Sequence, residues 1–266
     1  MASPSAKRDA LMPALFIGHG HPINAIQRND FTEALEKAGT RLPRPRAVLV
    51  VSAHWLVRNQ VLVSGTESPG MIYDFGPFHP DLFKVIYAAP GAPEQARRTA
   101  KLIRTRRVGI NTTRGFDHGA WTILKYLFPK ADIPVFQLSI DFAQPPRFHY
   151  DLGRELLPLR KEGVMIIGSG NIVHNLMQVA WDDVGAPPDG WARSFDSTVA
   201  GLLRKRGHDE LIDYGGLDLA DEAVPTNDHY LPMLYTLGLQ QEGESVEWLY
   251  EGFQYANMSM RCFSIS

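Results

Sequence analysis

The stretch AVLVVSAHW, residues 47–55, decides the fold and points to the chemistry. Its first five residues are apolar and rich in β-branched valine, and no polar residue alternates with them. A run of this kind is typical of a parallel strand that helices cover on both faces. The run is followed closely by His54, so the predicted strand carries an imidazole at its carboxyl end.

The same pattern occurs twice more in the chain. Residues 13–17 (PALFI) precede GHGH, and residues 164–167 (VMII) precede GSG and then His174. In open, mostly parallel α/β sheets, ligands bind just beyond the carboxyl ends of the strands. We therefore predict an α/β fold in which a central, mostly parallel sheet is flanked by helices on both faces, with the site at the carboxyl ends of the strands.

The rest of the chain is predicted to complete one domain. We expect residues 1–12 to form a flexible tail and residues 13–266 to form a single domain, because no linker divides them. Residues 64–93 are rich in glycine, proline and aromatic residues and are expected to form a long loop beside a pocket. Further helices are expected at about 30–39, 93–103, 119–128, 148–159, from 175 onward, 191–203 and 229–237, closing strands at 246–250 and 259–263, and an irregular acidic exposed segment at 207–226.

The bulk composition excludes several classes of protein. A net charge of −2 and the lack of a long basic run argue against a nucleic-acid partner. No apolar stretch approaches the roughly 18 residues that cross a bilayer. The single cysteine, Cys262, fits a reducing compartment, and the first dozen residues lack the apolar core of a secretory signal. We therefore expect a cytoplasmic protein without membrane partners, either a monomer or a small homo-oligomer.

The histidines are the candidate metal ligands. Neutral imidazole is the commonest metal ligand, and three or four brought together form a hydrolytic zinc site or a mononuclear iron site. His19 and His54 stand at strand ends, His174 follows a glycine-rich turn, and His229 stands beside Asp228. The alternative is that a histidine only caps a loop or bonds in the core.

The remaining histidines are likewise assigned either a functional or a structural role. His118, framed by glycines, is a candidate proton donor or substrate contact. We assign the structural role to His21, His79, His149 and His208, and expect His208 at the surface.

Aromatic residues cluster near these histidines or in the long loop, where they are predicted either to line a pocket for a flat ring or to pack in the core. They are Trp55, Tyr73, Phe75, Phe78, Phe116, Trp121 and Tyr230.

Six ordered motifs resemble one known family. They are GHGHP at 18–22, SAHW at 52–55, GFDHG at 115–119, QLSID at 137–141, GSGNIVHN at 168–175 and HYLP at 229–232. Together they resemble the LigB-like class III extradiol ring-cleavage dioxygenases, in particular the 4,5-DOPA extradiol type, from about Pro13 to the C-terminal end.

The resemblance implies roles for individual residues. It implies that His19 and His54 bind the metal, that His118 contacts substrate or oxygen, and that His174 is either a further ligand or the acid/base. His229 matches a ligand of the DOPA-type members, but better-known members use two histidines and a glutamate, so either His229 or the adjacent Asp228 is expected to reach the metal. His21 replaces a small polar residue of many members, which makes it a further candidate for weak metal binding or for tuning the site.

The implied function is a non-haem Fe(II)-dependent extradiol dioxygenase that opens the ring of a DOPA-like catechol with O2. No organic cofactor is implied, and Zn(II) is expected to be able to occupy the site, since its affinity for most N/O sites exceeds that of ferrous iron. Two alternatives remain: a zinc-dependent hydrolase, and a metal-binding interaction module on the same fold.

Overall fold

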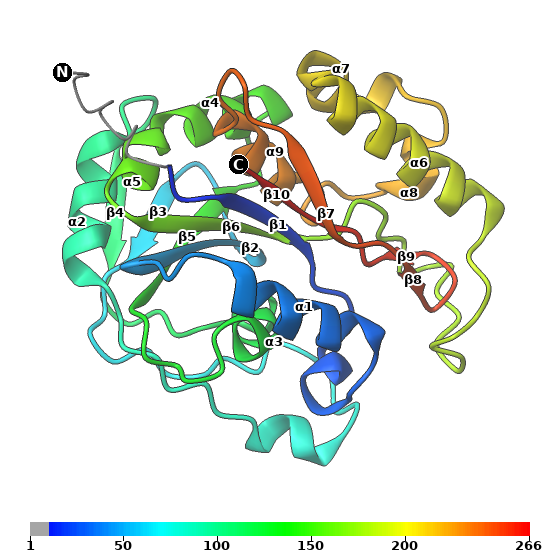
Figure 1. Ribbon diagram of the computed structural model, residues 1–266, viewed down its shortest axis with the longest axis horizontal. Coiled ribbons are helices and arrows are strands. Elements are labelled where there is room, and N and C mark those ends of the chain that lie inside the picture. The colour runs from blue at the N-terminus through cyan, green and yellow to red at the C-terminus, as the bar shows by residue number, and fades with distance from the viewer. Residues whose placement is uncertain (1–10) are drawn as a thin grey trace, which may run out of the picture.

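An eight-stranded sheet forms the middle layer of the molecule (Figure 1). The structure is a computed structural model, and it describes residues 11–266. Four adjacent parallel strands lie at the centre of the sheet: β5 (Val135–Asp141), β2 (Ala47–Val57), β6 (Val164–Gly170) and β1 (Ala14–Gly18). The predicted mostly parallel α/β sheet is therefore confirmed.

Antiparallel pairs extend this sheet on both sides. β3 (Val61–Ser64) is antiparallel to β5 and carries the edge strand β4 (Val108–Asn111) in parallel. On the other side β10 (Cys262–Ile265) pairs antiparallel with β1, and β7 (Val246–Tyr250) pairs antiparallel with β10. A small ribbon joins β8 (Phe253–Gln254) to β9 (Met258–Ser259). The sequence did not predict β4, since this half-exposed strand has no continuous apolar run, and the strand predicted at 259–263 is divided between β9 and β10.

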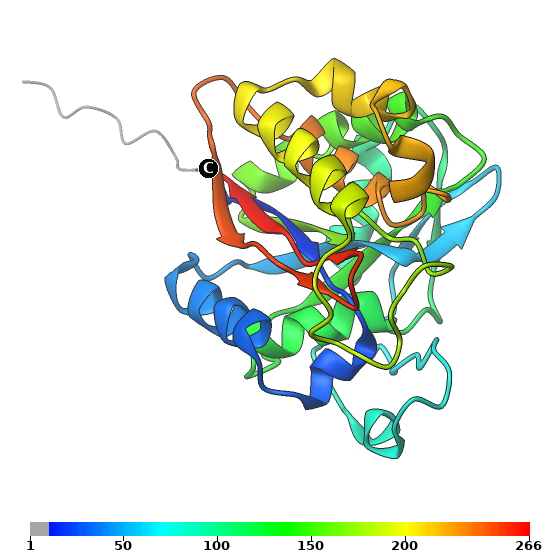
Figure 2. The ribbon, with the colours of Figure 1, turned by 90° about the vertical axis from the view of Figure 1, so that its right-hand side faces the viewer.

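Alternate residues of the central strands build two cores, one on each face. Leu15 and Val48 pack with α1 (Asp30–Arg41) and α3 (His118–Leu127), whereas Phe16 and Leu49 pack with the helices of the other face. Figures 1 and 2 show α1 and α3 on one side of the sheet and the second group on the other. That group contains α4 (Pro146–Glu155), α6 (Gly190–Lys205) and α9 (Leu231–Gly238), and its core also includes residues of α2 (Pro93–Leu102), α7 (His208–Ile212) and α8 (Ala220–Ala223).

Three predicted segments differ from the structure. The segment after Asn175 is not a helix, because the Asn175 side chain accepts from the backbone N–H of Met177 and donates to the carbonyl of Glu222, which favours a turn. Residues 207–226 contain α7, the 3-10 turn η3 (Tyr214–Gly216) and α8, and Leu211 is buried, so this segment is neither irregular throughout nor fully exposed. The helix predicted at 148–159 is divided into α4 and α5 (Leu157–Lys161), where Pro158 interrupts backbone bonding.

Met12, near the start of the described residues, is hydrogen-bonded to the domain. Met12 donates its backbone N–H to the carbonyl of Arg160 and accepts from Arg160 Nε at 2.6 Å. The predicted tail therefore does not extend to Met12, and its residues 1–10 lie outside the described part of the chain.

Within residues 11–266, no helix is both long enough and apolar enough to cross a membrane.

Candidate metal centre

His19 follows the last residue of the central strand β1. Its backbone N–H donates to the carbonyl of Gly170 on β6, and its Nδ1 lies 3.0 Å from Ser169 Oγ. Ser169 Oγ donates its own proton to the carbonyl of Gly119 at 2.6 Å, so it accepts from His19 Nδ1. The neutral His19 ring therefore carries its proton on Nδ1 and leaves the Nε2 lone pair for a cation.

His54 lies in an irregularity of β2. The pairing of β2 with β5 shifts between Val51 and Leu56, and a bulge of this kind re-aims side chains at the end of a strand. His54 Nε2 lies 3.1 Å from His19 Nε2, and its Nδ1 lies 3.4 Å from Asp74 Oδ2. Metal–nitrogen bonds of about 2.0–2.1 Å place neighbouring ligand nitrogens about 2.8–3.4 Å apart in octahedral or tetrahedral geometry, so the separation suits two ligands of one ion.

His229 reaches the site from the turn before α9. The turn fits closely against β6 because Gly170 has no Cβ; a Cβ there would lie 2.0 Å from the His229 carbonyl oxygen. His229 Nδ1 donates to Asp228 Oδ2 at 2.5 Å, which again leaves Nε2 as the open nitrogen. Asp228 thus stands behind His229 and orients it.

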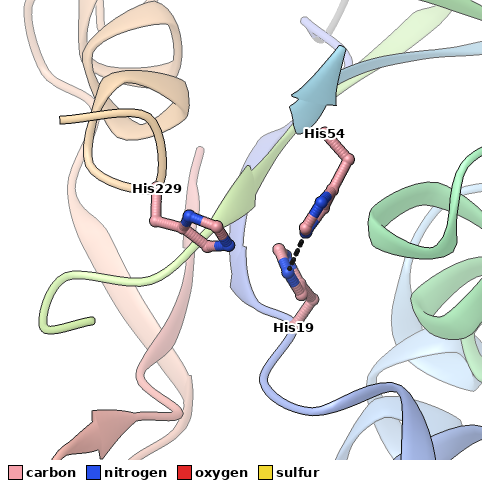
Figure 3. Close-up of side chains that lie close together, drawn as sticks. All are labelled: His19, His54 and His229. Carbon is pink, nitrogen blue, oxygen red and sulfur yellow. Dashed lines mark hydrogen bonds between the residues drawn. The ribbon is translucent and has the colours of Figure 1, made fainter. Parts of the chain in front are cut away.

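The three imidazoles converge on one point. The ligand nitrogens of His19, His54 and His229 all lie within 4.8 Å of one another (Figure 3). Burial, followed by the neighbouring imidazoles, lowers the pKa of His19 and of His54 well below its ordinary value, so both rings are neutral. Metal binding requires neutral imidazole, and three nitrogen donors suit zinc or iron. The residues present therefore fit a single metal ion.

His118 and Asp74 form a second layer beside His54. His118 begins α3, and both its backbone N–H and its Nδ1 donate to Asp74 Oδ1, at 2.9 and 3.0 Å. Burial raises the pKa of Asp74, but the bonds from His118 outweigh it and hold this pKa below its ordinary value. One carboxylate therefore orients His118 and also lies close to His54. Asp74 was not predicted as a site residue. In the sequence, only its position between two aromatic residues of the long loop, Tyr73 and Phe75, could have indicated it.

His174 lies flat against His229. The two rings stack with centroids 3.6 Å apart and planes 10° apart. His174 forms a group with Asp228 and His229, but not with His19 and His54. Burial and the neighbouring His229 lower the pKa of His174 well below its ordinary value, so the ring is neutral and able to accept a proton.

A cavity of about 200 Å³ opens above these histidines. This volume lies below the about 300–1,000 Å³ of typical drug-sized ligand sites, so it suits a molecule with a single ring. The cavity is lined by the five histidines named above together with Gly20, His21, Pro22, Asp74, Phe75, Gly76, Phe78, Leu176, Trp181 and Met258.

Comparison with known proteins shows the family of this chain. Residues 14–261 match the family described as the catalytic LigB subunit of aromatic ring-opening dioxygenase. The chain belongs to the LigB family. The predicted resemblance is confirmed, and with it the class of reaction, the extradiol opening of an aromatic ring.

Individual relatives of this LigB-family chain match it over nearly its whole length. The 4,5-DOPA dioxygenase extradiol of Escherichia coli K12 is 42% identical over 253 residues, which cover 94% of this chain and 93% of the relative. The 4,5-DOPA dioxygenase extradiol of Beta vulgaris is 35% identical, with 94% and 95% covered. The crystal structure of an uncharacterized protein of Escherichia coli K12 has a TM-score of 0.84 at 39% identity and covers 96% of this chain and 100% of its own.

A buried carboxylate joins three of the LigB-like motifs. Asp117 Oδ1 accepts from Ser52 Oγ at 2.7 Å, and its Oδ2 accepts from Gln137 Nε2 at 2.7 Å and from Arg114 Nη2 at 2.8 Å. Asp117 also caps α3 by accepting from the N–H of Ala120. The motifs SAHW, GFDHG and QLSID therefore hold His54 and His118 in place through one buried group.

Four of the aromatic residues predicted to line the pocket lie away from the cavity of this LigB-family chain. Tyr73 donates its hydroxyl to the carbonyl of Val85, and Tyr230 is fully buried with its hydroxyl bonded to the carbonyl of Leu211. Both hydroxyls are satisfied inside the protein. Phe116 and Trp55 are also buried in the interior, and so is Trp121, another candidate from the sequence. Phe75 and Phe78 do lie on the cavity wall.

Two histidines that were predicted to have a structural role also make further contacts. His21 lines the cavity as well as capping the 3-10 turn η1 (Pro22–Ile26). His208 is not simply at the surface, because it bonds to the Tyr150 hydroxyl at 3.0 Å and to Gln240 Oε1 at 2.8 Å.

Proposed function

We propose that this chain opens the ring of a single-ring, DOPA-like catechol with O2, and that Fe(II) held by His19, His54 and His229 serves this reaction. The proposal rests on one observation, the convergence of three imidazole nitrogens at the foot of a small aromatic cavity. Two relatives carry the name 4,5-DOPA dioxygenase extradiol, which supports a catechol as the substrate.

The reaction class favours iron over zinc. Fe(II), when bound, would supply the redox chemistry that lets O2 react with the ring, whereas zinc has no accessible redox change. Zinc nevertheless binds most nitrogen sites more tightly than ferrous iron, so it is expected to occupy the same three histidines and to inhibit.

The other histidines are assigned to proton transfer and substrate contact. His174 is neutral and faces the cavity, so we assign it the removal of a proton from one catechol hydroxyl and its later return. His118 has its Nδ1 bonded to Asp74, so its Nε2 is left to hydrogen-bond to a bound ligand. Phe75 lies edge-on to His118 at 5.5 Å and helps to exclude water from this side.

We also propose that the protein works in the cytoplasm as a monomer or small homo-oligomer. The only thiol, Cys262, is buried and bonds to the carbonyl of Met260, an arrangement that suits a reducing compartment.

The test compares metal-loaded forms of the whole chain. Apoprotein is loaded with Fe(II) or Zn(II) without oxygen, mixed with a catechol, and then exposed to O2 while oxygen uptake and the absorbance of the yellow ring-opened product are recorded. We expect uptake and product in equal amounts for the Fe(II) form and neither for the Zn(II) form. Oxygen-independent hydrolysis by the Zn(II) form, with no ring opening by the Fe(II) form, would contradict the proposal.

A further inference from the structure

His21 presents an unused hydrogen-bond donor on the wall of the cavity. Its Nδ1 accepts from the backbone N–H of Ile23 at 3.1 Å, so the proton of the ring is on Nε2. Among residues 11–266, no acceptor for this N–H is found, although His21 is only 7% exposed. Nε2 is not one of the fully enclosed unbonded atoms, as Nε2 of His149 is, so its N–H is open to the cavity that the ring lines.

The backbone and the neighbouring rings hold this donor in one orientation. Gly20 stands between His19 and His21 and has a φ of 64°, in the left-handed region that favours glycine. This turn lets both imidazoles line the same cavity. The His21 ring stands edge-on to Phe78 and to Tyr255, with centroids 4.3 and 5.5 Å apart. Rotation of the ring would break these contacts and the bond at Nδ1, so the Nε2–H group is preorganised.

Capping and metal binding do not account for this donor. His79 precedes Pro80 and caps the 3-10 turn η2 (Pro80–Lys84) in the same way, with its Nδ1 accepting from the N–H of Asp81 at 3.2 Å. The His79 side chain is nevertheless 46% exposed and does not line the cavity. His21 also belongs to none of the metal-ligand groups found in the described residues. Both roles leave Nε2 free, so a bound ligand is the partner that remains for it.

The position of His21 suits the substituent of a substrate rather than its diol. Phe78 and Trp181 stack on each other with planes 18° apart and close one side of the mouth beside His21. These two residues are 51% and 46% exposed, so a group at the mouth keeps part of its hydration. A partly hydrated carboxylate is accepted there at little cost, and a hydrogen bond to a charged acceptor is stronger than one to a neutral acceptor.

We infer that His21 is a specificity-determining residue, whose Nε2–H donates to a carboxylate on the ring substituent of the catechol. The inference rests on the proposed function, because it takes the diol to lie at His19, His54 and His229. It assigns recognition of the substituent to a residue outside the metal centre. His21 takes no part in proton transfer, so its loss should raise KM much more than it lowers kcat.

The test measures by calorimetry, without oxygen, how four catechols bind to the Zn(II)-loaded protein. L-DOPA and dopamine differ only in the carboxylate, and so do 3-(3,4-dihydroxyphenyl)propanoate and 4-ethylcatechol. We define the coupling factor as the loss of affinity that a variant causes for the carboxylate member of a pair, divided by the loss for the other member. A general disturbance of the cavity weakens both members equally and gives a factor near one, whereas loss of a direct bond to the carboxylate does not.

Three variants of His21 separate the donor from the cap. His21→Asn keeps an acceptor for the N–H of Ile23 but does not reach the Nε2 position, and His21→Phe keeps the ring but has no polar atom. We expect a coupling factor of about ten for each in both pairs, the lower end of what a hydrogen bond to a charged group contributes. His21→Gln places an amide nitrogen near the Nε2 position and should bring the factor back toward one. A factor near one for His21→Asn and His21→Phe in both pairs would overturn the inference.

Two further variants serve as controls. His79→Phe removes the matching cap outside the cavity and should give a factor near one. Trp181→Phe removes the indole N–H, another side-chain donor on the cavity wall, while it keeps an aromatic ring. A factor of about ten for Trp181→Phe, with a factor near one for the His21 variants, would assign the carboxylate to the indole and overturn the inference.

Steady-state kinetics of the Fe(II)-loaded protein separate this inference from the proposed function. For L-DOPA, His21→Asn should raise KM about tenfold and change kcat by less than about twofold. A large loss of kcat at unchanged KM would contradict a role in binding the substituent. If the coupling is found but the Fe(II) form opens no catechol, the proposed function fails while the role of His21 stands.

Discussion

Replacement of Asp74 by asparagine tests whether one carboxylate organises the metal centre. Asp74 accepts from the backbone N–H and Nδ1 of His118, and its other oxygen lies 3.4 Å from His54 Nδ1. An asparagine keeps the size of the side chain, but its NH2 group donates and cannot accept from the second imidazole. If the amide oxygen keeps both bonds from His118, the NH2 group faces His54 Nδ1 in place of a carboxylate oxygen.

The expected loss follows from this geometry. Partners of metal-binding histidines typically contribute 10–100-fold to affinity, which corresponds to about 1.4–2.8 kcal/mol. Only His54 belongs to the group of three converging ligands, so we expect the metal Kd to rise by about tenfold. The fold should lose no more than about 1–2 kcal/mol of stability, because the amide oxygen still accepts from the His118 backbone N–H.

The assay is a competition titration of Zn(II) against a fluorescent chelator, together with thermal unfolding of the apoprotein. The control is Asp81→Asn in the same loop, since Asp81 is exposed and bonds to Lys84, and the histidine beside it, His79, does not line the cavity. An Asp74→Asn variant that binds metal as tightly as the Asp81→Asn variant would refute the role assigned to this carboxylate.

Three further outcomes are expected. His54→Ala removes one of three nitrogen donors and should abolish stoichiometric metal in elemental analysis while the circular dichroism spectrum is retained. His174→Gln should keep both fold and metal but lower kcat by roughly 10²-fold or more, as loss of an acid/base group does, and full activity would exclude this role. Burial lowers the pKa of His149 to about 4. As the pH falls below about 6.5, this histidine is therefore protonated in the unfolded chain but stays neutral in the folded chain. The free energy of unfolding consequently decreases by about 2 kcal/mol between pH 7 and pH 5 because of this group. His149→Leu should flatten that pH dependence in urea titrations by this amount, and an unchanged slope would show that His149 is protonated in the fold.

The strand-end histidines were predictable because their signal is local. A parallel strand buried on both faces is a continuous apolar run, and its end marks the rim of the sheet. His19 follows the end of β1, whereas β2 continues past His54 to Val57, so the predicted strand end at His54 is instead an irregularity; the two rings do meet. Whether Asp228 or His229 reaches the metal could not be predicted from the neighbouring sequence. Either side chain could point into the site, and which one does depends on how the turn packs against Gly170.

Which aromatic residues line the cavity could not be predicted from the sequence. Tyr73 and Phe75 have the same chemical character and stand two residues apart, but only Phe75 lines the cavity. The hydroxyl of Tyr73 finds the carbonyl of Val85, a partner that no sequence pattern announces. His21 was predicted either to have a structural role or to bind metal weakly or tune the site, and its ring both caps a 3-10 turn and lines the cavity. One side chain can therefore have two roles that the sequence offers as alternatives.

The charge of a bound metal ion is balanced by carboxylates that lie outside the three histidine ligands. The three converging imidazoles are neutral ligands, so a dication bound among them would keep its full charge in a buried position. Compensation lies one layer out, at Asp74 and at Asp228, whose pKa is also held below its ordinary value because the bond from His229 outweighs the effect of burial. Two carboxylates balance a dication, and a catechol that has given up one proton adds one negative charge more. The outer carboxylates therefore make neutral imidazole ligands compatible with a buried dication, and removal of the Asp74 charge should weaken metal binding.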